Sequence, residues 1–419
     1  MVPDTVFVLS CRQTQMAMTA VGFGSKNGAC SASRSGRSGQ INLGFAEFFA
    51  GIGLVHLGLK PFGWHCVYAN DIDPKKKQMY DALFGPADYY HVEDIWRTDA
   101  VDSRIPANTV LATASFPCVD LSLAGNRKGL AGEESGAFYG FLKVLQRLRR
   151  RNGLPPLLLI ENVLGFLTSH SGKDFAEAVS SLAALGYALD AFVVDAKHFV
   201  PQSRPRLFLL GCVWDALSTE VAHGKNWNAE RSGIRPASLQ RATDNIRLKT
   251  GWMQLSLPPL PPTQRTLSDI IDQGDGEEWW EREKVEKHLA EMHPTHLRRI
   301  EKLKRSNVVA VGTIYRRVRQ GNSRSEIRTD GLAGCLRTPR GGSSRQIVFV
   351  AGNGELHMRW MSPREYARLQ GAADFPLEVD RNQALYGFGD AVCVPVISWI
   401  AEHALSQLIP ARLGVLATG

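Results

Sequence analysis

Two patterns of apolar and polar positions alternate along residues 41–213. Short apolar runs typical of strands are followed by turn residues, and then by segments whose apolar positions recur at helical spacing. The clearest helical segment, residues 135–153, repeats Phe138, Phe141 and Leu145 on one face and ends at an Asn-Gly pair. The runs predicted as strands are residues 41–49, 65–71, 109–115, 156–163, 188–196 and 206–213. Strands that alternate with helices predict an α/β fold with a doubly wound sheet.

This regular alternation ends after residue 213. A proline-rich stretch, LSLPPLPPTQ, is followed by a charged helical segment at residues 277–305 and by a basic region rich in Gly, Ser and Arg. Residues 250–375 are therefore predicted to form a second, smaller domain of short strands and irregular loops. Residues 41–245 are predicted to form the first domain, which residues 380–410 return to complete.

Residues 1–40 show no periodic pattern and are rich in Gly and Ser, which predicts a disordered tail. The tail lacks the features of a secretory signal, and no apolar run in the sequence reaches the roughly 20 residues of a membrane span. The seven cysteines include no C-x-x-C pair, which argues against a disulfide framework and a structural zinc site. We therefore expect a cytoplasmic protein without membrane contact.

The net charge of +8 is concentrated in one part of the chain. Residues 301–346 carry 11 Lys and Arg residues against 3 Asp and Glu residues, so this segment accounts for the whole excess. Such a basic segment favours a polyanionic partner, although a solvated basic face would have the same composition. The charge by itself leaves both interpretations open.

Several glycine and polar positions directly follow predicted strands. Gly51 and Gly53 lie in a turn after the first strand, and Asp71 ends the second. Cys118 follows a Phe-Pro pair after the third strand, and Glu161 ends the next. Each alone has an ordinary explanation: a tight turn, a helix cap, a structural thiol or a loop carboxylate. Because ligands bind beyond the carboxyl ends of strands in open α/β sheets, their shared position predicts a ligand site.

Five short motifs occur in a fixed order from residue 43 to the C-terminus: FAGIG, PC followed by SLAG, ENV, QSRPR and SPREYARLQG. In this order and spacing they resemble the motifs of the DNA cytosine-5 methyltransferases of bacterial and phage restriction-modification systems. The resemblance implies a Rossmann-like methyltransferase sheet and a target-recognition domain at residues 250–375. The implied activity is methyl transfer to C5 of a cytosine in a specific double-stranded DNA sequence.

The resemblance implies a catalytic role for four residues and no metal. Cys118 would add to C6 of the cytosine, which turns the electron-poor ring into an enamine that can attack an electrophilic methyl group. Glu161 would contact N3 and the exocyclic amine and stabilise charge as the thiolate adds. Arg204 and Arg206 lie two apart on an extended segment and so point the same way. They would hold the carbonyl of the base and a nearby phosphate.

The implied methyl donor is S-adenosylmethionine, with S-adenosylhomocysteine as the product. Phe49 would stack on the adenine, the turn at Gly51 would admit the methionine part, and Asp71 would bind the ribose. The residues assigned to the donor are Phe49, Ala50, Gly51, Gly53, Leu54, Asp71, Ile72, Asp94, Ile95, Pro117, Asp390 and Ala391.

A cytosine inside a duplex must be flipped out of the stack to reach such a site. The basic second domain would supply phosphate contacts and sequence readout. The stretch CLRTPRGGSSRQ is the best candidate, because Arg suits guanine and Gln suits adenine in the major groove. The residues assigned to DNA are Ser122, Arg337, Arg340, Ser343, Arg345 and Gln346. The implied partners are double-stranded DNA and, functionally, a cognate restriction endonuclease, and the protein is expected to act as a monomer in the bacterial cytoplasm.

Two positions depart from the family pattern. Residues 119–122 read Val-Asp-Leu-Ser where the family has Gln-x-Phe-Ser, and Asp390 stands where the family has an Asn beside the donor. Three other interpretations stay open. A related class of enzymes that modifies cytosine in transfer RNA shares the motifs but has a smaller recognition region. A DNA-binding protein with a decayed site would lack Cys118 or Glu161, and a nicotinamide dehydrogenase would explain neither the Pro-Cys motif nor the basic domain.

Overall fold

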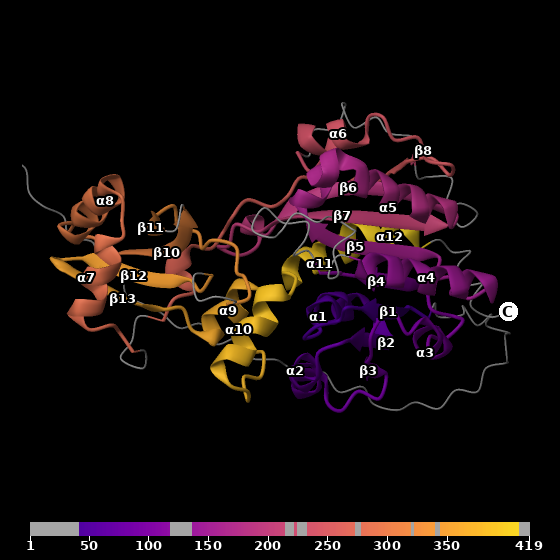
Figure 1. Cartoon of the computed structure of the whole chain (residues 1–419), viewed down its shortest axis with the longest axis horizontal. Helices are drawn as coiled ribbons and strands as arrows, with labels where there is room; N and C mark the ends of the chain where they lie inside the picture. Colours follow the sequence, from indigo (N-terminus) through magenta and orange to yellow (C-terminus); the bar gives the residue numbers. More distant parts are fainter. Residues whose placement is uncertain are drawn as a thin grey trace, which may run out of the picture. The chain divides into compact units, whose positions relative to one another are not determined.

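The computed structural model describes residues 42–117, 136–213, 222–223, 233–272, 278–319, 322–339 and 344–409. The tail predicted at residues 1–40 and the segment that begins at Cys118 lie outside the described residues. The described part contains a seven-stranded sheet with helices on both faces and a separate four-stranded antiparallel sheet (Figure 1).

The seven-stranded sheet has the strand order β3-β2-β1-β4-β5-β7-β6. Its strands are β1 (Gly44–Phe48), β2 (His65–Asp71), β3 (Tyr90–Val92), β4 (Leu111–Ala114), β5 (Leu157–Val163), β6 (Tyr187–Asp195) and β7 (Pro205–Val213). The first five strands pair in parallel, whereas β7 is antiparallel to both β5 and β6. Residues 196–204 connect β6 to β7 and are shorter than the about a dozen residues that a parallel crossover needs. The predicted doubly wound α/β sheet is confirmed, and β7, its last strand along the chain, runs antiparallel to both of its neighbours.

Helices cover both faces of this sheet. They are α1 (Leu54–Leu59), α2 (Pro74–Phe84), α3 (Thr98–Ser103), α4 (Ala137–Arg150), α5 (Lys173–Ala184) and α6 (Ala237–Thr243). Alternate side chains of β5 point to opposite faces, so Leu157 and Leu159 enter one apolar cluster and Leu158 and Ile160 enter another. The first cluster packs under α1 and α2, and the second under α4 and α5. The helix predicted at residues 135–153 is α4.

The C-terminal segment folds back onto α1. It comprises α10 (Arg381–Asp390), α11 (Val394–Ile400), a π-helical turn (Ala401–Leu405) and α12 (Ser406–Leu408). The Ser398 hydroxyl of α11 donates to the carbonyl of Gly58 in α1 at 3.0 Å. A Cβ on Gly58 would lie 2.7 Å from Ile397, so glycine is needed for this close approach. The stretch Arg381–Leu408 is apolar and long enough to suit a membrane span, but 72% of its apolar window is buried inside the fold, as in a core helix.

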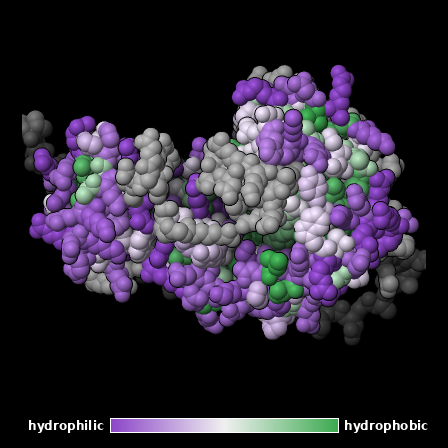
Figure 2. Space-filling model, viewed as in Figure 1, coloured by the Kyte–Doolittle hydropathy of each residue, from purple (hydrophilic) through white to green (hydrophobic). Residues whose placement is uncertain are grey.

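The four-stranded sheet has the order β11-β10-β12-β13 and is antiparallel throughout. Its elements are β10 (Ala310–Arg319), β11 (Asn322–Arg328), β12 (Ile347–Gly352), β13 (Glu355–Trp360), α7 (Arg282–Ala290) and α8 (Pro294–Lys304). Ile300, Phe349 and Met358 are fully buried in its core. A Cβ on Gly312 would lie 2.3 Å from the Phe349 ring, so β10 needs glycine there. The surface over this sheet and its helices is mostly hydrophilic (Figure 2).

The remaining described elements are a two-stranded sheet of β8 and β9, one further helix and several short 3₁₀ segments. They are β8 (Ala222–His223), β9 (Met253–Gln254), α9 (Pro363–Leu369) and the 3₁₀ segments η1 (Lys60–Phe62), η3 (Leu164–Gly172), η4 (Ala196–His198) and η7 (Leu267–Asp269). A capping box between Ser362 and Glu365 starts α9. Glu365 also forms a fully buried ion pair with Arg359 at 2.6 Å, which ties α9 to the end of β13.

The central strand β1 carries a buried carboxyl group. Glu47 is 1% exposed. Burial raises the pKa of Glu47 well above its ordinary value, the backbone of His56 lowers it in part, and the charge of Asp71 raises it further. Because the pKa of Glu47 is higher in the folded state than in the unfolded state, its contribution to the free energy of unfolding is fully present below the unfolded-state pKa. This contribution is lost as pH rises through the folded-state pKa.

Replacing this carboxyl by an amide, Glu47→Gln, is therefore expected to stabilise the protein increasingly as pH rises. The two proteins should have similar free energies of unfolding near pH 4.5, and the variant should gain about 1–3 kcal/mol at pH 8. Urea unfolding of both proteins between pH 4.5 and 8 measures the difference. A difference that does not change with pH would contradict the assignment.

Candidate active site

The chain turns sharply directly after β1. Phe49, Gly51 and Gly53 have positive φ angles of 56°, 55° and 82°, a region that favours glycine. A Cβ on Gly53 would lie 2.6 Å from the rings of Tyr80 and Phe84. A Cβ on Gly51 would meet nothing closer than a carbonyl oxygen at 4.0 Å. The backbone at Gly51 is therefore open to close approach by a ligand.

Asp71, at the end of β2, holds this turn. Its Oδ2 accepts a hydrogen bond from the Gly51 amide at 3.0 Å, and its Oδ1 accepts one from the Asp73 amide at 3.0 Å. The Tyr90 hydroxyl donates to the Gly51 carbonyl at 2.9 Å. Asp71 is 6% exposed, whereas the next residue, Ile72, is 68% exposed. A carboxylate beside an open glycine turn and an exposed apolar side chain suits a ligand that carries both hydroxyl groups and an apolar ring.

Other residues assigned to the donor have mostly buried side chains. Ala50, Leu54 and Ile95 are 6%, 2% and 4% exposed and pack in the core. Asp94 accepts a hydrogen bond from the Trp96 amide at 3.0 Å, which fixes the turn after β3. The structure therefore leaves few of the side chains assigned to the donor open to a ligand.

Asp390, at the end of α10, forms an ion pair with Lys76 of α2. The Lys76 ammonium lies 3.2 Å from Asp390 Oδ2 and 3.9 Å from Asp71 Oδ2. Burial lowers the pKa of Lys76, but the charges of Asp71 and Asp390 outweigh burial and raise it overall. Sequence reasoning missed Lys76, because it is the middle of three consecutive lysines and nothing in the sequence distinguishes it. The unusual acid at position 390 thus has a partner in the protein itself.

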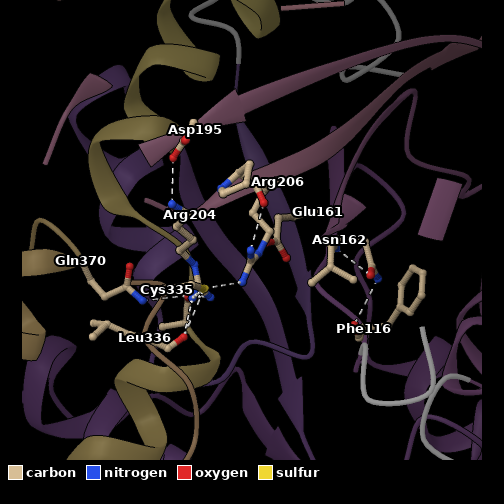
Figure 3. Close-up of polar contacts among 12 residues, drawn as sticks. Phe116, Glu161, Asn162, Asp195, Arg204, Arg206, Cys335, Leu336 and Gln370 are labelled. Atoms are coloured by element: carbon tan, nitrogen blue, oxygen red, sulfur yellow. Dashed lines mark hydrogen bonds and ion pairs between the residues drawn. The ribbon is translucent and has the colours of Figure 1, made fainter. Parts of the chain in front are cut away.

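Glu161 and Arg206 face each other across neighbouring strands. Glu161 lies near the end of β5 and Arg206 near the start of β7, and the two strands pair antiparallel. The Arg206 Nε lies 2.9 Å from Glu161 Oε1 (Figure 3). The guanidinium is planar and permanently charged, so it fixes one carboxylate oxygen in place. The Glu161 side chain is still partly exposed at this edge of the sheet, so a base could reach its carboxylate.

Arg204 is 3% exposed and is held by hydrogen bonds to three segments. Its amide donates to Asp195 Oδ1 at 2.8 Å, its Nη1 donates to the Leu336 carbonyl at 3.0 Å, and its Nη2 donates to the Ala391 carbonyl at 2.6 Å. Gln370 also donates to the Ala391 carbonyl, at 3.1 Å. Arg204 therefore joins the start of β7 to the segment around residue 336 and to the C-terminal segment.

The segment that leads to Cys118 leaves the sheet beside Glu161. β4 and β5 are adjacent parallel strands, so both end at the same edge. The Asn162 side-chain amide donates to the Phe116 carbonyl at 3.3 Å, which ties the two strand ends together (Figure 3). Pro117 is exposed and is the last described residue of this segment. The assignments of Cys118 and Ser122 lie outside the described residues and stay predictions.

Cys335 contacts both arginines of the candidate site, and sequence reasoning missed it. Its sulfur lies 3.4 Å from Arg204 Nη1 and 3.6 Å from Arg206 Nη2 (Figure 3). Cys335 opens the stretch that was singled out for its arginines, and no spacing in the sequence connects it with residues 130 positions earlier. Only the fold brings the thiol and the two guanidinium groups together.

The residues assigned to DNA differ in exposure. Arg337 is exposed. Arg345 lies over the Trp360 ring at 4.8 Å, in a cation–π contact. Gln346 is 5% exposed, and its backbone N–H donates to the Tyr366 hydroxyl oxygen at 3.4 Å. Its side chain is therefore not presented to a ligand in this structure. Arg340 and Ser343 lie outside the described residues.

Within the described ranges, no group of three or more His, Cys, Asp or Glu side chains is placed to hold a metal ion. The turn at Gly51 with Asp71 and the pair of Glu161 with Arg206 both lie where parallel strands of the large sheet end. The arrangement combines a place for a nucleoside-like ligand with a carboxylate fixed by a guanidinium.

Comparison with known proteins agrees with the motif order. Residues 43–406 match the C-5 cytosine-specific DNA methylase family. The chain is 26% identical over 380 residues to the Type II methyltransferase M.BsuFI of Bacillus subtilis, covering 90% of this chain and 76% of that one. It is 28% identical over 366 residues to the Type II methyltransferase M.NlaX of Neisseria lactamica, covering 86% and 96%. The solved structure of the Entamoeba histolytica methyltransferase EhMeth has a similar fold, with a TM-score of 0.59, 14% identity, and coverage of 88% of this chain and 100% of that chain.

The family match spans most of the chain, including every motif quoted from the sequence. The resemblance to restriction-modification methyltransferases is therefore confirmed. The chain belongs to the C-5 cytosine-specific DNA methylases and is a DNA cytosine methyltransferase.

Proposed function

We propose that this protein methylates C5 of a cytosine flipped out of double-stranded DNA, with S-adenosylmethionine as the donor and a covalent bond between Cys118 and C6 of the base. The observation that carries the proposal is the pairing of Glu161 with Arg206 at the sheet edge where the segment leading to Cys118 also ends. A fixed carboxyl group beside the nucleophile-bearing segment is what addition to a pyrimidine requires.

The residues present fit the proposed donor. The open backbone at Gly51 admits a close ligand, the Asp71 carboxylate can accept hydrogen bonds from ribose hydroxyls, and the exposed Ile72 side chain can pack on adenine. S-adenosylmethionine supplies an electrophilic methyl group on a sulfonium centre. The Phe49 ring and the main chain at Ala50, Gly53, Leu54, Asp94, Ile95, Pro117 and Ala391 complete the proposed donor set.

The catalytic steps follow from the chemistry of the side chains. The Cys118 thiolate forms a bond to C6, and Glu161 shares a proton with N3 so that the electron pair can reach C5. C5 then forms its bond to the methyl group while the bond from that methyl to the sulfonium sulfur breaks, which leaves S-adenosylhomocysteine. The proton on C5 then leaves to solvent, and its electron pair restores the C5–C6 double bond and expels the thiolate. Arg206 holds Glu161 in position throughout. Arg204 acts through the backbone carbonyls that it binds, because it is buried among them.

The basic region is proposed to bind the DNA. Residues 250–375 form the target-recognition domain, and residues 41–245 with 380–410 form the catalytic domain. Arg337, which is exposed, and Arg340, Ser343 and Arg345 nearby are proposed to contact DNA, whereas the buried Gln346 supports this segment from within. The protein is proposed to act as a monomer in the bacterial cytoplasm, alongside a restriction endonuclease.

The direct test is expression of the protein in cells that lack cytosine methylation, followed by bisulfite sequencing of their DNA. We expect protected cytosines within one short sequence. Protection in transfer RNA with none in DNA would favour the RNA-modifying alternative, and no protection in either would reject the proposal.

The acid at position 390 gives a prediction about donor binding. Asp390→Asn removes a carboxylate that is half exposed and paired with Lys76, so we expect the Kd for S-adenosylmethionine to stay equal or rise by no more than about threefold. Lys76→Met should weaken binding more, because it leaves two carboxylates without their shared cation. Isothermal titration calorimetry measures both values.

Mass spectrometry of the modified base tests whether Asp390 changes the group that is transferred. The wild-type protein and Asp390→Asn should both produce 5-methylcytosine. An added group other than a single methyl from the wild-type protein would show that Asp390 selects a different donor.

A further inference from the structure

Cys335 differs from the other described thiols in what surrounds it. Cys66, Cys212 and Cys393 are buried, and burial raises the pKa of each. Cys335 is only half-buried, and its sulfur faces the guanidinium groups of Arg204 at 3.4 Å and Arg206 at 3.6 Å. Both arginines belong to the site around Glu161, so Cys335 is in direct contact with its charged groups.

Backbone hydrogen bonds fix the segment that carries Cys335. The Ala333 amide donates to the Pro201 carbonyl at 2.8 Å, and the Ser203 amide donates to the Ala333 carbonyl at 3.0 Å. The Leu336 amide donates to Gln202 Oε1 at 3.1 Å, and Gln202 is fully buried. Because both sides of Cys335 are tied to the segment just before β7, the position of the sulfur between the two arginines is built into the fold.

Charges around the sulfur favour its ionised form. Burial by itself raises the pKa of the Cys335 thiol, but the charges of Arg206 and Arg204, the hydrogen bond from Arg206 and the charge of Arg337 together outweigh burial and bring it to about 7. Among the described residues, Tyr366 of α9 also faces Cys335. Arg206, which contacts the Cys335 sulfur, also forms the ion pair with Glu161. Near neutral pH, Arg206 therefore lies between two acidic groups.

We propose that Cys335 is a positioning residue for methyl transfer: its sulfur holds one end of the Arg206 guanidinium so that the other end stays on Glu161 when the base enters. The guanidinium is planar and rigid, so fixing Nη2 against the sulfur also fixes Nε against the carboxylate. This inference rests on the proposed function, because it assigns Cys335 a role in the step that Glu161 serves.

The pH dependence of this role has a defined sign. A thiol whose folded-state pKa is lowered contributes its interaction fully above the unfolded pKa and loses it as pH falls through the folded pKa. The hold on Arg206 is therefore strongest at alkaline pH and fades as the thiol is protonated near pH 7. A serine at this position can accept a hydrogen bond but does not ionise in this range, and an alanine can do neither.

The test measures single-turnover methyl transfer by the full-length protein, with saturating donor and a synthetic duplex that contains the target sequence, from pH 6 to pH 9. At pH 8.5, Cys335→Ala is expected to be about tenfold slower than the wild type and Cys335→Ser about threefold slower. The ratio of the wild-type rate to the Cys335→Ser rate should fall toward 1 as the pH is lowered from 9 to 6. Taking the ratio cancels the pH dependence of the Cys118 nucleophile, which both proteins share.

Two further variants separate positioning from general packing. Cys212→Ala removes a buried thiol from β7 that contacts neither arginine, so it should lower the melting temperature without giving a pH-dependent rate ratio. In an Arg206→Lys background, Cys335→Ala should have an effect of less than about twofold, because the group through which Cys335 acts is gone.

The outcomes distinguish this inference from the proposed function. If the wild-type protein transfers no methyl group to DNA, the proposed function fails and this inference fails with it. If the wild type is active but the rate ratio does not change with pH, or Cys335→Ala slows the Arg206→Lys protein as much as it slows the wild type, the positioning role of Cys335 alone is overturned.

Discussion

Replacing Cys118 by serine is expected to slow methyl transfer by at least about a thousandfold while leaving the affinity for DNA within about threefold. The reason is chemical, since a serine hydroxyl is hardly ionised at neutral pH and cannot add to C6 of cytosine. DNA affinity should survive because the proposed phosphate and base contacts come from the basic region at residues 301–346. Single-turnover methylation and a gel-shift assay on the same duplex measure the two quantities.

A duplex with 5-fluorocytosine at the target position makes the covalent step visible. Fluorine at C5 cannot leave as a proton does, so the wild-type protein should remain attached to the DNA through Cys118 after methyl transfer. Cys66→Ala, which removes a buried thiol from β2, serves as the control and should still form the adduct. Full activity of Cys118→Ser, or an adduct formed through another residue, would reject Cys118 as the nucleophile.

Glu161→Gln is expected to reduce the methylation rate by about 100- to 1000-fold with little change in folding or DNA affinity. The amide has nearly the same shape as the carboxyl group and can still accept a hydrogen bond from Arg206. It cannot deliver a proton to N3 of the base, so addition of the thiolate would leave unstabilised charge on the ring. The loss should therefore appear in the single-turnover rate and not in the Kd for DNA.

Glu177→Gln is a suitable control for this experiment. Glu177 accepts a hydrogen bond from the Tyr139 hydroxyl at 2.7 Å on the surface of α5, so the same change there removes a charge without touching the site. Its rate should stay within about twofold of the wild type. A rate for Glu161→Gln within threefold of the wild type would show that Glu161 has no part in proton transfer.

The order of strands and helices was predictable because the apolar pattern has local causes. Alternating faces of the strands and helical spacing in segments such as α4 depend on neighbouring residues, and the structure confirms the doubly wound sheet. The reversal of β7 was not predicted, because it depends on which strand edge is free for pairing and not on the composition of β7. The length of the connection at residues 196–204 indicates the reversal, because it is shorter than the about a dozen residues that a parallel crossover needs.

The positions of Gly51, Asp71 and Glu161 at strand ends also followed from the sequence, whereas Arg206 reaches this edge only because β7 is reversed. In a parallel sheet, residues after successive strands gather at one edge whatever the details of packing, so motif order and strand order suffice to place them together. Comparison with known proteins then confirmed the family that these motifs indicated.

Only the tertiary structure decided which other groups meet these residues. It placed Cys335 against Arg204 and Arg206 and paired Lys76 with Asp390. It also buried Gln346, which the sequence analysis had assigned to DNA contact. Each of these contacts joins segments more than 100 residues apart or depends on the packing of whole elements. A local pattern reports which face of a strand or helix is apolar, but the partner of a polar side chain is set by how those elements pack, and that information is spread over the whole chain.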